Sequence, residues 1–99
     1  MTNSPLLTED EITAGLAALP GWQRQGAAIT RTADAADFPS AIRVVVAVAE
    51  AAEEMNHHPD IDIRWRTLTF ALSTHSAGGV TDLDLRLAAR IDAAFNQQS

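Results

Sequence analysis

Apolar and polar residues along this chain change twice from a helical spacing to an alternating, strand-like spacing and back. Apolar positions three or four residues apart predict helices over 9–19, 38–56 and 82–95, whereas alternating positions predict strands over 61–65 and 68–72. Shorter segments at 22–24 and 28–31 predict a first hairpin around a glycine. We therefore expect one α+β domain over residues 1–99, in the order αββαββα. Its four-stranded antiparallel sheet should carry the helices on one face.

Two of the expected helices begin with the same local motif. Thr8 is followed three residues later by Glu11, and Thr81 is followed three residues later by Asp84. A threonine hydroxyl and a carboxylate at this spacing form a capping box, in which each side chain bonds a backbone N–H at the helix start. The capping box is by itself sufficient to explain Asp84. Asp37 is a third candidate helix cap.

The helix over 38–56 is apolar around most of its circumference, which predicts burial on more than one side. We expect one side to cover the sheet. A row formed by Val44, Val48, Ala51 and Met55 would then pack against a second copy of the chain. With pairing at the sheet edge, this arrangement predicts a homodimer or homotetramer. The alternative is a valine-rich helix that its own chain covers.

The second predicted hairpin has its turn near Arg66, because the apolar phase of the strands reverses there. Trp65 lies just before the turn and is expected in the core or in a pocket wall. One face of the last strand should carry small residues suited to lining a pocket. These residues are Thr67, Thr69, Ala71 and Ser73.

Composition excludes several classes of protein. The net charge is −6, and all seven cations are arginines, which disfavours nucleic-acid and anionic-membrane binding because both need clustered cations. The chain has no cysteine and no apolar run of the ~20 residues that a membrane span needs. Its first residues lack the basic and apolar regions of a signal peptide. A cytoplasmic location is therefore expected.

All three histidines lie within residues 57–75. His57 and His58 come where the long helix gives way to the third strand, and His75 follows the fourth strand. Since antiparallel neighbours bring the entry of one strand close to the exit of the next, the three imidazoles are expected at one end of the sheet. Glu53 lies four residues before His57, so its carboxylate is expected to accept from that imidazole and fix its tautomer. This cluster predicts proton-transfer chemistry.

A purely structural role and a metal site both compete with that prediction. Taken singly, His58 is explained as a residue that ends a helix before Pro59, and His75 as a residue of a surface loop. Three histidines with an aspartate would also suit zinc or iron. However, adjacent histidines rarely point at one ion, and the chain has no HxH, HxxxH or HExxH spacing. We therefore expect no metal site.

These residues resemble a known signature. The run Glu53-x3-His57-His58-Pro59-x5-Trp65-x9-His75-x8-Asp84 is similar to that of the pterin-4a-carbinolamine dehydratase family. The resemblance extends over nearly the whole chain through Leu19-Pro20-Gly21-Trp22, Phe38 and Leu72-Ser73-Thr74-His75. It implies an αββαββα fold, agreeing with the order read from the apolar pattern. It also implies dehydration of a 4a-hydroxytetrahydropterin to quinonoid dihydropterin, without a cofactor, to recycle the pterin used by an aromatic amino-acid hydroxylase.

The resemblance also implies roles for individual residues. His57, His58 and His75 would form the catalytic set, with His57 and His75 favoured for proton transfer and His58 for binding. Ser73 and Thr74 would contact the pterin. The full set of implied site residues is His57, His58 and His75 for catalysis, Asn56, Trp65, Ser73, Thr74 and Ser76 for substrate binding, and Glu53 and Asp84 in support.

The chain departs from the family pattern at two positions. Asn56 and Ser76 stand where many members have acidic residues, which bears on affinity or stereochemical preference. Some chains of this fold look like non-catalytic assembly or interaction proteins with degraded histidine sets, and this alternative stays open, although the intact histidine set here favours the enzyme. The alanine-rich, lysine-free composition is typical of a bacterial protein. We therefore do not transfer the transcription-factor partnership of animal members.

Overall fold

The computed structural model describes residues 4–98, so both ends of the predicted domain, 1–3 and 99, lie outside the described residues. The described elements follow the predicted order αββαββα, and the predicted α+β fold is confirmed. The strand boundaries differ slightly from those predicted, because Trp22 and Trp65 lie outside strands. The elements are α1 (Glu9–Ala17), β1 (Gln23–Gln25), β2 (Ala28–Asp34), α2 (Phe38–Met55), β3 (Asp60–Arg64), β4 (Thr67–Leu72) and α3 (Asp82–Gln98).

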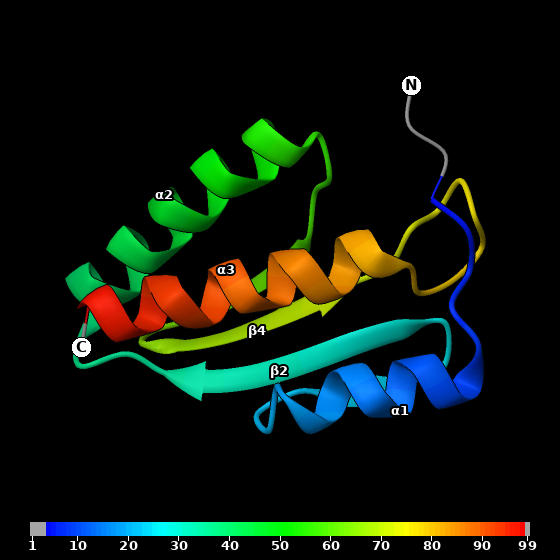
Figure 1. The fold of residues 1–99 in the computed structure, drawn as a ribbon. Coiled ribbons are helices and arrows are strands. Elements are labelled where there is room, and N and C mark those ends of the chain that lie inside the picture. The colour runs from blue at the N-terminus through cyan, green and yellow to red at the C-terminus, as the bar shows by residue number, and fades with distance from the viewer. Residues whose placement is uncertain (1–3, 99) are drawn as a thin grey trace.

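The four strands form one antiparallel sheet in the order β1-β2-β4-β3. Alternate residues of neighbouring strands share a face, so Phe70 lies between Arg31 of β2 and Ile61 of β3. The apolar members of this row face the helices, which cover one side of the sheet (Figure 1). On the other side, the Thr69 hydroxyl bonds the Thr32 hydroxyl at 2.9 Å. This open side therefore carries small and polar residues, as the alternation predicted.

The core lies between the sheet and the helices α2 and α3. Phe70 is fully buried, and its ring meets that of Phe95 edge to face, with the ring centroids 6.0 Å apart. Aromatic pairs prefer this geometry because the positive ring edge approaches the negative face. The other large apolar side chains that are fully buried are Ile29, Leu68, Leu72, Leu87, Ile91, Val44, Val48 and Val80.

The rotation of α2 about its axis corrects one prediction. Val44, Val48 and Ala51 were predicted to pack against a second copy of the chain. They are instead buried in the core of their own chain. The exposed apolar side chains of α2 are instead Phe38 and Val46, at 46% and 55%, with Ile42 between them at 36%. Both rows repeat every three to four residues. The apolar pattern alone therefore did not distinguish the inner row from the outer one.

Trp65 corrects a second prediction. It lies in the two-residue turn between β3 and β4, has a φ of 57°, and is 71% exposed. The Arg66 guanidinium lies over its ring, 5.6 Å from the centroid. Trp65 is therefore neither a core residue nor a wall of a pocket within this chain.

Among residues 4–98, no helix is long and apolar enough to cross a membrane.

Candidate active site

The site begins where α2 ends. Asn56 adopts a left-handed conformation, with φ 50° and ψ 45°, and its N–H bonds the carbonyls of Ala52 and Glu53. The next N–H, that of His57, bonds the carbonyl of Ala52 at 3.0 Å. These bonds form the Schellman arrangement, which satisfies the last helical carbonyls. The left-handed residue turns the chain off the helix axis, so His57 and His58 do not continue the helix.

The imidazole of His57 pairs with the carboxylate of Asp84, which comes from a different helix, α3. Its Nε2 lies 2.5 Å from Oδ1 of Asp84, which lies in the first turn of α3. Asp84 is completely buried, and the His57 side chain is 9% exposed. The sequence predicted that Asp84 acts as a helix cap. The structure shows a second contact, because its two oxygens face different partners.

The partner of Glu53 differs from the prediction. Its Oε2 lies 2.5 Å from Nε2 of His58 rather than from His57. The i, i+4 spacing fails as a guide because Asn56 ends the helix between Glu53 and the histidines. Both partners are largely exposed, with side-chain exposures of 56% for His58 and 78% for Glu53. The outward-facing pair is therefore open to solvent, whereas the His57–Asp84 pair is not.

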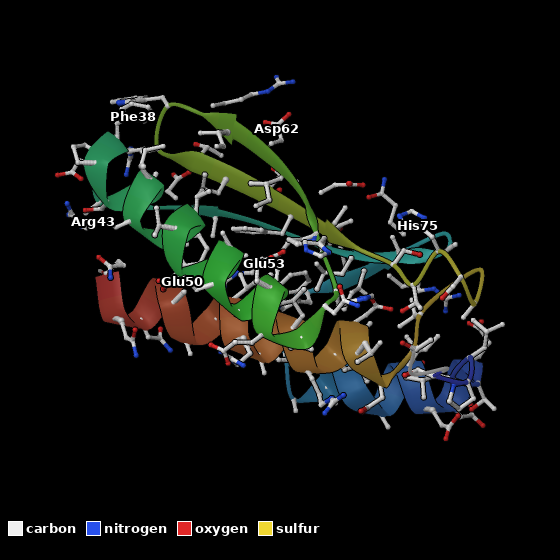
Figure 2. All side chains as sticks on the ribbon, turned by 90° about the horizontal axis from the view of Figure 1, so that it is seen from above. Phe38, Arg43, Glu50, Glu53, Asp62 and His75 are labelled. Atoms are coloured by element: carbon white, nitrogen blue, oxygen red, sulfur yellow. The ribbon has the colours of Figure 1, made fainter. Side chains whose placement is uncertain are left out.

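His75 lies on a short loop that follows β4. The loop is closed by a backbone bridge between Thr74 and Gly79, and the N–H of Gly78 bonds the carbonyls of Thr74 and His75. His75 and Ser76 are exposed at this loop. In Figure 2, His75 lies at the end of the molecule opposite Phe38, which begins α2. The topology thus places all three histidines toward the same end of the sheet, but within residues 4–98 no hydrogen bond links His75 to the other two.

A cavity of about 250 Å³ lies beside His57. It is contributed by the end of α2, by the loop after β4 and by the start of α3, three segments far apart in the sequence. Of the predicted residues, it brings together Asn56, His57, Thr74 and Ser76. Three further residues, Met55, Leu83 and Arg86, line the cavity and were not predicted as site residues. Leu83 and Arg86 are three residues apart on α3, so they share a helical stripe, but nothing in the sequence indicated that this stripe faces a cavity.

Four residues predicted for catalysis or substrate binding do not line this cavity, namely His58, His75, Trp65 and Ser73. Trp65 is at the turn of the β3–β4 hairpin, the end of these strands away from the histidines. Ser73 donates its hydroxyl to the carbonyl of Ala27 at 2.7 Å. It does not line the cavity beside His57. Within residues 4–98, no group of three or more His, Asp or Glu side chains is arranged to hold a metal ion.

Comparison with known proteins identifies relatives over almost the full length. Residues 5–94 match the family model described as pterin 4 alpha carbinolamine dehydratase. A protein of Nocardia farcinica, provisionally named pterin-4-alpha-carbinolamine dehydratase, is 59% identical over 88% of this chain and 92% of its own. A protein of the same provisional name from Mycobacteroides abscessus is 58% identical over 93% of this chain and 98% of its own.

Solved structures with a similar fold point to the same family. The crystal structure of a transcriptional coactivator/pterin dehydratase from Brucella melitensis superposes with a TM-score of 0.88 and 37% identity. The match covers 90% of this chain and 97% of that one. A pterin dehydratase-like RuBisCO assembly factor of the alpha-carboxysome has a TM-score of 0.61 over 74% of this chain and 84% of its own. At 19% identity it shares the fold alone. From the family match, the close relatives and the fold, the chain belongs to the pterin 4 alpha carbinolamine dehydratase family.

Proposed function

We propose that this protein dehydrates a 4a-hydroxytetrahydropterin to quinonoid dihydropterin by histidine general acid–base catalysis. The observation that carries the proposal is the cavity beside His57, which Asn56, Thr74 and Ser76 also line. Family membership supplies the substrate class, and the names of the relatives point to the same reaction. The cavity combines the apolar side chains of Met55 and Leu83 with polar groups that converge on a buried histidine, and such convergence marks a candidate small-molecule site.

The reaction needs two proton transfers. The N5 lone pair of the pterin expels the 4a-hydroxyl, which must be protonated to leave as water, and a base must take the proton from N5. Each transfer suits an imidazole, since its unperturbed pKa lies near neutrality. We assign these transfers to His57 and His75, and substrate binding to His58. Asp84 orients His57 and Glu53 orients His58, consistent with their contacts of 2.5 Å.

The physiological role follows from the family resemblance. By that resemblance, this dehydration recycles the pterin cofactor after aromatic amino-acid hydroxylation. We therefore propose a place in pterin recycling, in the cytoplasm, with a functional link to such a hydroxylase. The intact set of His57, His58 and His75 favours this enzyme over the alternative of a non-catalytic assembly protein of the same fold.

Stopped-flow absorbance on freshly generated carbinolamine tests the activity. The wild-type protein should accelerate loss of the 4a-hydroxyl. His57→Ala and His75→Ala should each lower the rate by ~10²–10⁴-fold, the usual contribution of one proton-transfer group. Thr32→Val, on the open side of the sheet, is a matched control for a change that leaves the site intact. Unchanged rates for both histidine variants would overturn the assignment.

The proposed mechanism uses no metal, which gives a separate prediction. Activity should survive exhaustive chelation, because imidazoles carry both proton transfers. Elemental analysis of the purified protein should find no stoichiometric zinc or iron. One tightly bound metal per chain that is lost in His75→Ala would support a metalloenzyme instead.

We also propose that the chain forms a homodimer at least, with a homotetramer as the larger form. The support comes from the exposed apolar row of Phe38, Ile42 and Val46. Beside this row lies a shallow hollow of about 770 Å³ on the outer side of α2, which Val46 and Glu50 line. The edge strand β3, which includes the 43% exposed Ile63, offers a second surface.

Light scattering during size exclusion tests the assembly. Val46→Glu should lower the assembly state and keep the fold, because this side chain lies on the outer row. Val44→Glu should unfold the domain, because it places a charge in the core. A wild-type protein that remains a monomer at micromolar concentration would refute the interface.

A further inference from the structure

Beneath the cavity, two threonines are bonded to the carboxylate that pairs with His57. The hydroxyl of Thr74 lies 2.8 Å from Oδ2 of Asp84 and 2.7 Å from the hydroxyl of Thr81. The backbone N–H of Thr81 donates to the same Oδ2 at 2.9 Å. Thr74 is 5% exposed, and Thr81 and Asp84 are not exposed at all. No buried side-chain nitrogen or oxygen within the described residues lacks a partner.

Counting hydrogens fixes the direction of these bonds. The Thr81 hydroxyl oxygen accepts from the N–H of Leu83 at 3.2 Å, which leaves its single proton to donate elsewhere. An ionised carboxylate only accepts, so Thr74 must donate its single proton to Asp84. In the contact between the two hydroxyls, Thr81 is therefore the donor and Thr74 the acceptor. Every proton in the cluster has one destination.

The same count extends to the imidazole. Two donors already occupy Oδ2 of Asp84, and Oδ1 faces Nε2 of His57. A carboxylate that only accepts requires Nε2 of His57 to carry the hydrogen in their contact. The neutral imidazole is then the Nε2–H tautomer. Its Nδ1 is the ring nitrogen left for the cavity that His57 lines.

We propose that Thr74 and Thr81 are positioning residues: acting through Asp84, they hold His57 as the Nε2–H tautomer and present its Nδ1 to the substrate. This role differs from the predicted pterin contact, since the one hydroxyl proton of Thr74 points at Asp84. The tautomer stands on the hydrogen-bond geometry together with an ionised Asp84. Only the kinetic consequence rests on the proposed dehydration.

The tautomer can be measured without substrate. The measurement uses ¹⁵N-labelled wild-type protein at a pH at which the imidazole of His57 is neutral. The Nε2 of His57 should then show the chemical shift of a protonated nitrogen, and Nδ1 that of an unprotonated one. Comparison with the spectrum of His57→Gln assigns the resonances. Thr74→Val removes a donor to Oδ2 of Asp84, and Thr81→Val removes the hydroxyl that bonds Thr74. In both variants the carboxylate is free to turn away from Nε2, so His57 should shift toward a mixture of tautomers, whereas Thr74→Ser and Thr81→Ser should preserve the wild-type pattern. Thr69→Val, which loses a hydroxyl on the open side of the sheet, should also preserve it.

Kinetics provide the second readout. Thr74→Val should lower kcat about 10- to 100-fold with little change in KM, by analogy with the range found when a residue that supports a metal-ligating histidine is lost. Thr74→Ser should restore most of kcat. A wild-type His57 with its hydrogen on Nδ1 overturns the proposal, and this result stands even where a valine variant does not fold. A Thr74→Val protein with unchanged tautomer and kcat also overturns it. A wild-type protein without dehydratase activity refutes the proposed function but leaves the tautomer result intact.

Discussion

Two helices of this protein start with the same motif but make different use of it. At α1, the Thr8 N–H bonds Oε1 of Glu11 at 2.8 Å and the Glu11 N–H bonds the Thr8 hydroxyl at 3.1 Å, both on the surface. At α3, the Thr81 N–H bonds Oδ2 of Asp84, and the whole motif is buried. Each carboxylate caps a helix. Only that of Asp84 has its second oxygen on a histidine.

The difference comes from what surrounds each helix start. The end of α2 and the loop after β4 pack over the start of α3 and bring His57 and Thr74 to the capping carboxylate. Nothing comparable covers Glu11, whose hydrogen bonds are exposed. A helix cap can thus also hold a histidine in place once it is buried. The local motif identifies a helix start, and the tertiary environment decides whether it also has a chemical role.

The largest expected effect is the difference in kcat between variants of the two capping carboxylates, Asp84 and Glu11. Asp84→Asn should lower kcat by ~10²–10⁴-fold, because an amide cannot accept at both positions and one end must present N–H groups to its neighbours. Glu11→Gln should leave kcat unchanged, since glutamine also completes a capping box. Stopped-flow measurement of carbinolamine dehydration compares the two variants directly. Equal rates for Asp84→Asn and wild type would mean that the buried box, like the surface one, only caps its helix.

A smaller effect concerns the helix end that supplies His57 to the buried box. Asn56→Val should lower the free energy of unfolding by about 1–2 kcal/mol, because a β-branched residue is strained at φ 50°. Asn56→Gly is the matched control and should retain most of the stability, since glycine accepts this conformation. Urea denaturation at constant m-value gives both numbers. A valine variant as stable as the glycine variant would show that the left-handed turn is not required.

The fold was largely predictable because its signals are local. Alternation gave the strands, three-to-four-residue spacing gave the helices, and the two threonine motifs marked two helix starts. The side chains paired at the site were less accessible. His57 and Asp84 are 27 residues apart, and no local spacing indicates that they meet. The sequence instead favoured Glu53 as the partner of His57, on the assumption that the helix continued through Asn56.

Two further errors had the same physical origin. On α2, the inner row of Val44 and Val48 and the outer row of Ile42 and Val46 are equally apolar, so only packing reveals which row is buried. Trp65 was expected in the core or in a pocket wall, but its position in the two-residue turn of the hairpin exposes it. In each case composition identified a residue type that is usually buried. The backbone path then decided its environment.

The smallest expected effect comes from the third helix cap, Asp37, whose carboxylate accepts from the Ser40 N–H at 2.8 Å at the exposed start of α2. Hydrogen bonds from the Ser40 side chain and then from its backbone N–H lower the pKa of Asp37 below 3.8, with a smaller contribution from the charge of Arg43. A lowered folded-state pKa means that the ionised cap stabilises the fold at and above neutral pH. That contribution begins to decline near the unfolded-state pKa and is lost as the pH falls through the folded-state value.

Asp37→Asn isolates this contribution, because asparagine still caps a helix but does not titrate. The urea midpoint of wild type minus that of Asp37→Asn should be constant from neutral pH down to about pH 5. Below about pH 4 this difference should fall, because wild type loses its ionised cap and the variant does not. Measuring the difference removes the acid response of the other carboxylates, which both proteins share. At the surface box, Glu11→Gln provides the corresponding comparison for a capping carboxylate at N3. A difference for Asp37→Asn that does not vary with pH would show that the charge of this cap, unlike its hydrogen bond, contributes nothing to stability.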